Sequence, residues 1–262
     1  MKQRLWMVWQ LARRDLFARL RGSRLGLAWL LLTPLAFLGA YVFVFVYVLK
    51  ARWPGIGGEG EAGALGSALA IYAGLIVHGL AAEAMIRAPG LIREQPHLVT
   101  KVVFPLHWLP VSALAGALIQ TALNLAVLIA AAALVGGGLH TRMLLAPLAL
   151  LPLAVGVLAL LWFLAALGVF VRDAAQAVAP LAALLLFFSP VFWPLEALAP
   201  NVRWLFHANP LTLPIAWLRS AVLGLGEIDP LAWAAYLAAA TLCALAALAF
   251  FRRLTPGFAN EL

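Results

Sequence analysis

The sequence predicts an all-α protein that crosses a membrane several times, and two observations support that prediction. Hydrophobic residues make up 65% of the chain and charged residues only 11%, whereas about a quarter of the residues of a soluble domain are charged. Several stretches with almost no charge approach the roughly 20 residues that a helix needs to cross the hydrocarbon core of a bilayer. Because hydrocarbon offers the backbone no hydrogen-bond partner, we expect these stretches to be helices.

Six spanning helices are expected within a single transmembrane domain that covers residues 1–262. The apolar stretches that predict them run over residues 25–49, 64–86, 106–135, 143–170, 174–193 and 230–251. Most Lys and Arg residues fall into the segments that share a side of the membrane with the N-terminus. The positive-inside rule therefore predicts that both termini are cytoplasmic, with a membrane region over 25–253 and a cytosolic tail at 254–262.

Residues 1–22 are expected to form a helix that lies on the cytoplasmic membrane surface without crossing it. Leu5, Trp9, Ala12 and Leu16 recur at steps of three and four residues and make one apolar stripe. Arginines fall mostly on the other side, which suits the headgroup plane of a bilayer. A plain orientation anchor is the alternative role for this helix.

The first three spans carry aromatic and polar side chains that share helix faces. Three aromatic residues of the first span recur at steps of four, a pattern that is also typical of packing or lipid contact. In the third span, small and amide residues from Ser112 to Asn124 form a face that either lets helices approach closely or lines a wet path. The second span contains one acidic residue, Glu83, whose side chain could either line a pathway or reach the membrane interface. The residues predicted to line a channel are Phe37, Tyr41, Phe45, Tyr72, Glu83, Gln120 and Asn124.

The segment IRAPGLIREQPHLVTKVVFP, residues 86–105, connects the second and third spans on the cytoplasmic side. It is too polar to cross the membrane and too apolar to stay free in solution, so a short helix that docks onto a cytoplasmic partner fits it. A second cytoplasmic turn, VRDAAQ, holds an Arg-Asp pair that could also be an ordinary exposed ion pair of little energetic value. The residues predicted to couple to that partner are Arg93, Glu94, His97, Lys101, Arg172 and Asp173.

The segment FFSPVFWPLEALAPNVRWLFHANP, residues 187–210, combines four prolines with many aromatic residues. Non-helical backbone at membrane depth requires shelter by protein or by a water-filled cavity. We therefore expect a re-entrant pair of short helices, at about 195–207 and 211–224, that caps a pathway from outside. A surface loop with aromatic interface anchors is the alternative. The predicted external gate residues are Phe192, Trp193, Trp204 and Phe206.

The sequence lacks the motifs that are typical of nucleotide binding, metal binding or catalysis. It has no G-x-x-x-x-G-K-[ST] phosphate loop, no H-E-x-x-H motif and no cysteine cluster, and its five histidines are scattered. We therefore expect no enzymatic activity, no bound metal and no cofactor in this chain. The energy for any transport has to come from another polypeptide.

The sequence starts with WQLARRDLFARLRGSRLGLAWLLLTPL from residue 9 onward, and YVFVFVYVLKARWPG follows. This order of segments resembles the membrane subunits of bacterial polysaccharide ABC exporters, the type-2 ABC permeases for O-antigen, teichoic acid or capsule chains. REQPHLVTKVVFPLHWLPV looks like the cytosolic gate and coupling segment of that family, and RDAAQAVAPLAALLLFFSPVFWPLEALAPNVRWLFHANPLT like its fifth span and external hairpin. The tail TPGFANEL is also similar. The start resembles the O-antigen and teichoic-acid branches more than the capsule branch.

This resemblance implies a half-transporter in the bacterial plasma (inner) membrane. Two copies would form a channel at their interface, and two ABC ATPase subunits would dock beneath and carry the ATP and Mg. The implied cargo is similar to an undecaprenyl-linked polysaccharide. Arginine suits its pyrophosphate because the guanidinium is always charged and offers forked donors. The candidates for that contact are Arg13, Arg14, Arg21 and Arg24.

Two other functions remain open from the sequence. A drug or small-lipid exporter would keep the same architecture and the same ATPase partner but would carry a different cargo. A membrane enzyme acting on lipid-linked sugars would need acids that converge on one site. Glu83, Glu94 and Asp173 are too dispersed in the sequence to favour that enzyme.

Overall fold

The computed structural model describes residues 26–50, 53–54, 56, 61–100 and 104–261, together with Trp6 and Gln10. These residues form helices and turns, without a strand among them, as the sequence predicted. The α-helices are α2 (Trp29–Val42), α3 (Glu61–Arg87), α4 (Pro96–Thr100), α5 (Trp108–Val135), α6 (Ala146–Phe170), α7 (Ala174–Phe187), α8 (Pro200–His207), α9 (Thr212–Leu223), α10 (Pro230–Leu254) and α11 (Phe258–Glu261). The 3₁₀ helices are η1 (Gly26–Ala28), η3 (Ala88–Gly90), η4 (Thr141–Leu145), η5 (Leu195–Ala197) and η6 (Thr255–Gly257), and η2 (Phe43–Val48) is a π-helix.

Five helical segments in this part of the chain are long and apolar enough to cross a membrane. They are Trp29–Val48, Gly63–Gly90, Trp108–Val135, Thr141–Phe170 and Pro230–Glu261. These segments match the first four predicted spans and the last one in position, length and apolar composition. The predicted fifth span, 174–193, contains only α7, a helix of 14 residues. At 1.5 Å per residue α7 is about 21 Å long, so a sixth crossing stays a prediction.

Proline accounts for the early end of α7. The residue before a proline is pushed out of the helical region, and proline itself donates no backbone hydrogen bond. Pro190 follows α7 closely, and the helix ends at Phe187. Apart from η5, the segment that follows has no helix until α8 begins at Pro200, so α7 ends earlier than the apolar composition predicts.

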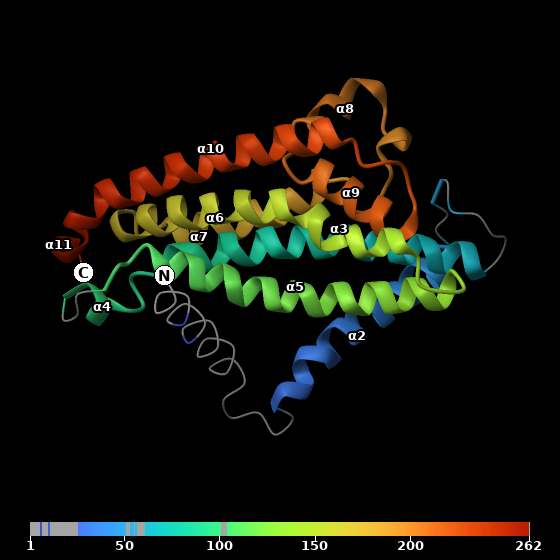
Figure 1. Ribbon diagram of the computed structural model, residues 1–262, viewed down its shortest axis with the longest axis horizontal. Helices are drawn as coiled ribbons and strands as arrows, with labels where there is room; N and C mark the ends of the chain where they lie inside the picture. Colours follow the sequence, from blue (N-terminus) through green and yellow to red (C-terminus); the bar gives the residue numbers. More distant parts are fainter. Residues whose placement is uncertain are drawn as a thin grey trace.

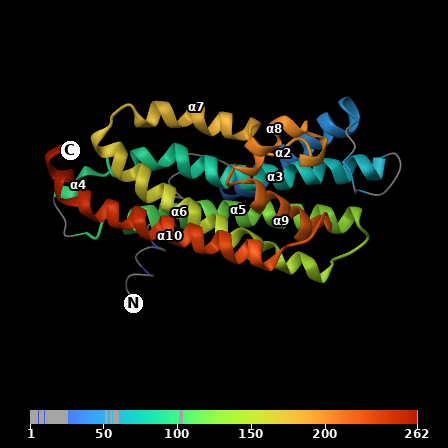
Figure 2. The same cartoon turned by 90° about the horizontal axis from the view of Figure 1, so that it is seen from above.

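The helices α3, α5, α6, α7 and α10 run side by side, whereas α2 lies at an angle to them, and the short elements gather at the two ends of the bundle (Figure 1). In the view from above, α7 and α10 lie at opposite edges, with α3 between them (Figure 2). α4 and α11 occupy one end of the bundle, whereas α8 and α9 occupy the other. The predicted coupling segment and the predicted external hairpin therefore lie at opposite ends, as the predicted topology requires.

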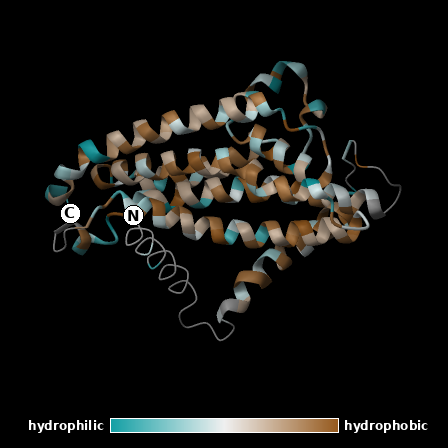
Figure 3. Cartoon of the chain, in the orientation of Figure 1, coloured by the Kyte–Doolittle hydropathy of each residue, from teal (hydrophilic) through white to brown (hydrophobic). Residues whose placement is uncertain are grey.

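Hydrophobic residues cover most of the length of the helices, and hydrophilic residues concentrate towards the ends (Figure 3). The centre of the bundle is built by α3, α5 and α6. Ile71 and Leu80 of α3 are fully buried, as are Leu128 of α5 and both Val157 and Leu161 of α6. This packing makes α3 and α6 the inner helices, while α2 has only Pro34 buried.

Local chemistry fixes where the last helices begin and end. The side chain of Asp229 accepts a hydrogen bond from the Leu231 backbone N–H, at 2.9 Å, and Pro230 opens α10. An acidic cap followed by proline at the first position is a strong helix start. Gly224 ends α9 in the left-handed conformation, with φ at +69°, which glycine adopts without steric cost.

Close contacts hold together the end of the bundle that carries α4 and α11. A Cβ atom on Gly168 of α6 would overlap the backbone of Pro89 in η3, so this approach requires glycine. Phe258 of α11 is fully buried, with its ring centre 5.4 Å from that of Phe251 and 5.8 Å from that of Phe170. α11 also contacts α4. The C-terminal tail is therefore packed against the same end of the bundle as the predicted coupling segment.

Candidate functional site

An aromatic row runs from α2 to the segment that follows α7. Successive ring centres lie 6.3 Å apart between Phe37 and Tyr41, and 6.5 Å apart between Tyr41 and Phe45. The ring of Phe45 then lies 6.1 Å from Phe192, which lies 6.0 Å from Trp193. We call these five residues the aromatic row. It joins residues predicted to line a channel to residues predicted to form the external gate.

The backbone of η2 contributes to this arrangement. η2 is a π-helix, in which the Leu49 N–H donates to the carbonyl of Val44, five residues earlier, at 2.8 Å. Phe45 lies within this π turn and contacts Phe192, whereas Phe43 and Tyr47 form a separate, exposed pair with ring centres 6.4 Å apart. Single π turns within α-helices often occur at functional sites.

Tyr72 of α3 connects the row to α5. Its ring centre lies 6.4 Å from that of Tyr41, and its hydroxyl donates to Oδ1 of Asn124 at 3.4 Å. Tyr72 is buried, and Asn124 is half-buried. Tyr72 and Asn124, both predicted to line a channel, therefore connect the row to α3 and α5.

The face of α5 that runs from Ser112 to Asn124 is buried in its first half and half-buried in its second. Ser112 and Gly116 are buried, and the Arg87 guanidinium of α3 lies 3.8 Å from the place where a Gly116 Cβ would stand. This half of the face packs against α3. Gln120, like Asn124, is half-buried.

Glu83 lies apart from the aromatic row. It is half-buried on α3, 11 residues from Tyr72 in the sequence. This separation corresponds to about 16 Å along the helix axis. Glu83 lies one helical turn before Arg87, toward the end of the bundle that holds α4.

Arg219 of α9 is buried, and sequence reasoning did not single it out. Its Nε donates to the carbonyl of Ala70 at 2.8 Å. Its two terminal nitrogens donate to the carbonyls of Pro190 at 2.8 Å and of Val191 at 2.7 Å. Its Cζ also lies 4.2 Å from the centre of the Trp53 ring, within the range of a cation–π contact.

These contacts position one end of the aromatic row. The backbone after α7 is irregular, and its buried carbonyls need partners that no helix supplies. Arg219 supplies them for Pro190 and Val191, directly before Phe192. The signal in the sequence was an arginine inside the apolar run TLPIAWLRSAVL, because a charge in such a setting marks a functional or structural site.

Asn209 ties the turn between α8 and α9 to the end of α7. Its Nδ2 donates to the Phe188 carbonyl and to Oγ of Ser189, both at 2.9 Å. Its Oδ1 accepts from the Leu211 N–H at 2.8 Å. The neighbouring carbonyl of Pro210 accepts from the hydroxyl of Tyr236 in α10, at 2.8 Å. α7, α9 and α10 are thus held together at this end.

The other two predicted gate residues lie on α8. Trp204 is 67% exposed, whereas Phe206 is buried. Within the described residues, the ring contacts of the row include Phe192 and Trp193 but neither residue of α8. The structure therefore brings half of the predicted gate set into the row.

The predicted coupling residues collect at the opposite end. Arg93, Glu94 and His97 are exposed around α4, and Arg172 and Asp173 are exposed between α6 and α7. η3, which leads to α4, packs against α6 and α7. Lys101 lies outside the described residues. So do the pyrophosphate candidates Arg13, Arg14, Arg21 and Arg24.

Helices of membrane-spanning length with exposed apolar surfaces define the class of the protein, which is a multi-pass helical membrane protein. Residues 7–223 match the family described as ABC-2 type transporter. The chain belongs to that family and is a type-2 ABC permease subunit. It is similar to a protein of Myxococcus xanthus named O-antigen export system permease protein RfbA, with 29% identity over 188 residues. The match covers 72% of this chain and 68% of that relative.

Proposed function

We propose that this permease forms the channel of an ATP-driven exporter of lipid-linked polysaccharide of the O-antigen or teichoic-acid type. The relative from Myxococcus xanthus is named for O-antigen export, which supports a polysaccharide cargo. The observation that supports the proposal most is the aromatic row from Phe37 to Trp193. It extends from the middle of the first span to the end of the bundle that carries α8 and α9.

The chemistry of the row suits a long sugar chain. Sugars present apolar C–H faces, on which aromatic rings can slide without a fixed hydrogen-bond pattern. A conduit has to bind at many weak sites, because tight binding at one site would stop the cargo from leaving. The two ends of the row, Phe37 and Trp193, are 54% and 38% exposed, so the rings are accessible to a passing chain.

A dimer would complete the pathway. The rings at the two ends of the row are exposed in a single chain, and so are leucines of α2 and residues of α7 such as Leu184 and Phe187. In a C2 pair the same surface would face its own copy, and two rows would line one passage. We propose this homodimer as the working unit in the bacterial plasma membrane, with both termini cytoplasmic.

The motor would bind at the end that carries α4 and α11. Membership of the ABC-2 family implies an ABC transport system with a partner ATPase. The exposed side chains of Arg93 and Glu94, in the turn before α4, and of His97, on α4, offer that ATPase a polar surface. Arg172 and Asp173, between α6 and α7, are exposed too, and η3 packs against both of those helices. ATP and Mg would be held by the partner and not by this chain.

The test is reconstitution of the permease with its ATPase in proteoliposomes. We expect undecaprenyl-linked polysaccharide to stimulate ATP hydrolysis and to become accessible to a sugar-cleaving enzyme added on the far side. A panel of amphiphilic drugs and short lipids serves as the comparison. Stimulation by those compounds, without any by the polysaccharide, would contradict the proposed cargo and favour a drug or small-lipid exporter.

A further inference from the structure

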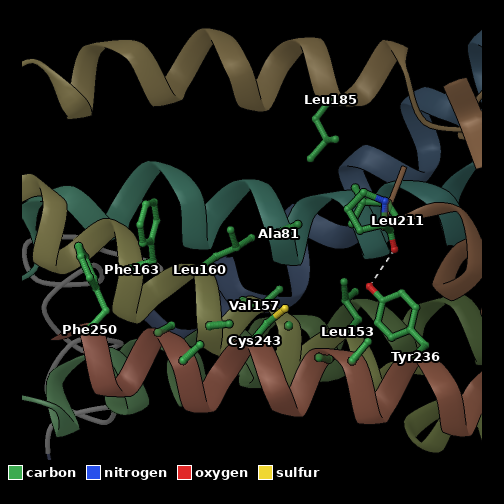
Figure 4. Close-up of a pocket in the computed structure, with 17 residues that line it drawn as sticks. Ala81, Leu153, Val157, Leu160, Phe163, Leu185, Leu211, Tyr236, Cys243 and Phe250 are labelled. Atoms are coloured by element: carbon green, nitrogen blue, oxygen red, sulfur yellow. Dashed lines mark hydrogen bonds between the residues drawn. The ribbon is translucent and has the colours of Figure 1, made fainter. Parts of the chain in front are cut away.

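A large apolar cavity lies between α3, α6, α7 and α10, and no residue of the aromatic row lines it. Its volume is about 670 Å³. Its walls include Leu160 and Phe163 of α6, Cys243 and Phe250 of α10 and, across from them, Leu185 of α7 (Figure 4). This cavity is separate from the proposed sugar pathway.

The lining of the cavity excludes a polar ligand. It consists of hydrocarbon side chains apart from the Tyr236 hydroxyl and the thiol of Cys243, the single cysteine of the chain. That hydroxyl already donates to the carbonyl of Pro210 at 2.8 Å (Figure 4). A buried water needs two to four polar partners, roughly, and the lining does not offer them. The cavity therefore suits hydrocarbon.

The shape of the cavity follows from small residues on α10. Ala239, Ala240, Cys243, Ala246 and Ala247 recur at steps of three and four, so they share one face of the helix. Such a face lets α10 approach α6 closely. α7 stays at the opposite edge of the bundle (Figure 2). The space between α7 and α10 is therefore left open.

The cavity is continuous with the lipid-facing surface. Leu160, Phe163 and Phe250 line it, yet they are 38%, 43% and 37% exposed. Leu242 and Leu245, which flank the cavity face on α10, are also exposed. In a multi-pass membrane protein this outer surface of α6 and α10 faces the hydrocarbon of the bilayer. The medium that reaches the cavity is therefore the interior of the membrane.

We propose that this cavity binds an acyl chain of a bilayer phospholipid. The acyl chain enters the cavity sideways from the bilayer, so it passes from one hydrocarbon environment into another. Its affinity therefore comes from close contact with the cavity wall and not from escape from water. If the cavity were empty, the side chains of α3, α6, α7 and α10 that line it would lack those contacts. The bound chain fills the space between α7 and α10 and supports the packing of α7, which ends early at Phe187.

The experiment uses the full-length protein in nanodiscs made with a phosphatidylcholine that carries a diazirine in the middle of one acyl chain. After illumination, mass spectrometry locates the cross-links. We expect them to concentrate on cavity residues of α6 and α10. Ala246→Phe fills the cavity from an exposed position on its wall. It should reduce cavity cross-links about tenfold, which corresponds to about 1.4 kcal/mol of lost contact energy.

Ala249→Phe is the matched control, since it adds the same ring to an exposed position of α10 that does not line the cavity. Its cavity cross-links should equal those of the unmodified protein, and both variants should keep the thermal midpoint of the parent. Two results would overturn the proposal. The cross-links could be spread evenly around the helices and be unaffected by Ala246→Phe. Or unlabelled polyprenyl phosphate could displace the probe when an equal amount of unlabelled phospholipid does not.

Discussion

The Cζ atom of Arg219 lies 4.2 Å from the centre of the Trp53 ring. The backbone N–H of Trp53 in turn donates to Oγ of Ser67 in α3 at 2.8 Å. The same guanidinium binds carbonyls of α3 and of the segment after α7. Arg219 therefore joins Trp53, α3 and the segment after α7, which are far apart in sequence. It positions the backbone directly before Phe192 and Trp193, at one end of the aromatic row.

Arg219→Met should lower the free energy of unfolding by about 3 kcal/mol or more, because it removes three hydrogen bonds and leaves the carbonyls of Pro190 and Val191 without this donor. Arg219→Lys keeps the charge but lacks the planar fork, so it should restore only part of that loss. Unfolding in mixed micelles, followed by circular dichroism, measures both. Arg142→Met is the control at an exposed position and should change the free energy by less than about 0.5 kcal/mol. Equal effects for the substitutions at 219 and 142 would refute the anchoring role.

Gly168→Ala should disturb the contact between α6 and η3. The new methyl group would overlap the backbone of Pro89, which cannot move as a side-chain end can. Overpacking of this kind costs about 1 to 3 kcal/mol. Gly156→Ala on the same helix is the matched control, because its Cβ would meet only Ala240 Cβ, at an ordinary 3.9 Å. The same thermal midpoint for both variants would contradict this account.

Asn209→Ala should loosen the turn between α8 and α9 from the end of α7. The substitution removes three hydrogen bonds and leaves the Phe188 carbonyl without this donor. A cost of about 2 kcal/mol is expected for such a buried loss. Limited proteolysis and unfolding in micelles measure it. Asn201→Ala, at an exposed position of α8, should leave both unchanged, and a comparable loss there would argue against a specific role for Asn209.

Replacement of Arg93, Glu94 and His97 by Ala together should abolish cargo-stimulated ATP hydrolysis by the complex. All three side chains are exposed, so membrane insertion and thermal stability should stay unchanged. Arg252→Ala with Arg253→Ala is the control, because it removes exposed charges of α10 outside the coupling segment. Hydrolysis and export that persist in the triple variant would contradict a coupling role for residues 93–97.

The sequence predicted most helices because the signals for them are local. Uninterrupted apolar runs predicted four spans and the last span, and prolines predicted short helices near the observed α8 and α9. The end of α7 was placed too late. Its apolar composition continues past Phe187, but Pro190 ends the helix, and Asn209 and Arg219 then bind the carbonyls that follow.

The site was predicted less completely because its contacts join distant residues. Steps of four placed Phe37, Tyr41 and Phe45 on one face, and the structure confirms that their rings are neighbours. No local pattern could show that Phe45 meets Phe192. Arg219 was missed for the same reason, since its partner Ala70 lies 149 residues earlier in the chain.

Polysaccharide export by a Phe45→Ala, Phe192→Ala variant tests the central claim most directly, with a Phe43→Ala, Tyr47→Ala variant as its control. Loss of two rings, and with them three ring contacts of the row, should slow export about tenfold, while ATP binding by the partner and the amount of assembled complex stay the same. The control pair lies outside the row, so it should export at the rate of the parent. Normal export by the first variant, or an equal loss in the second, would contradict the aromatic row as the path of the sugar chain.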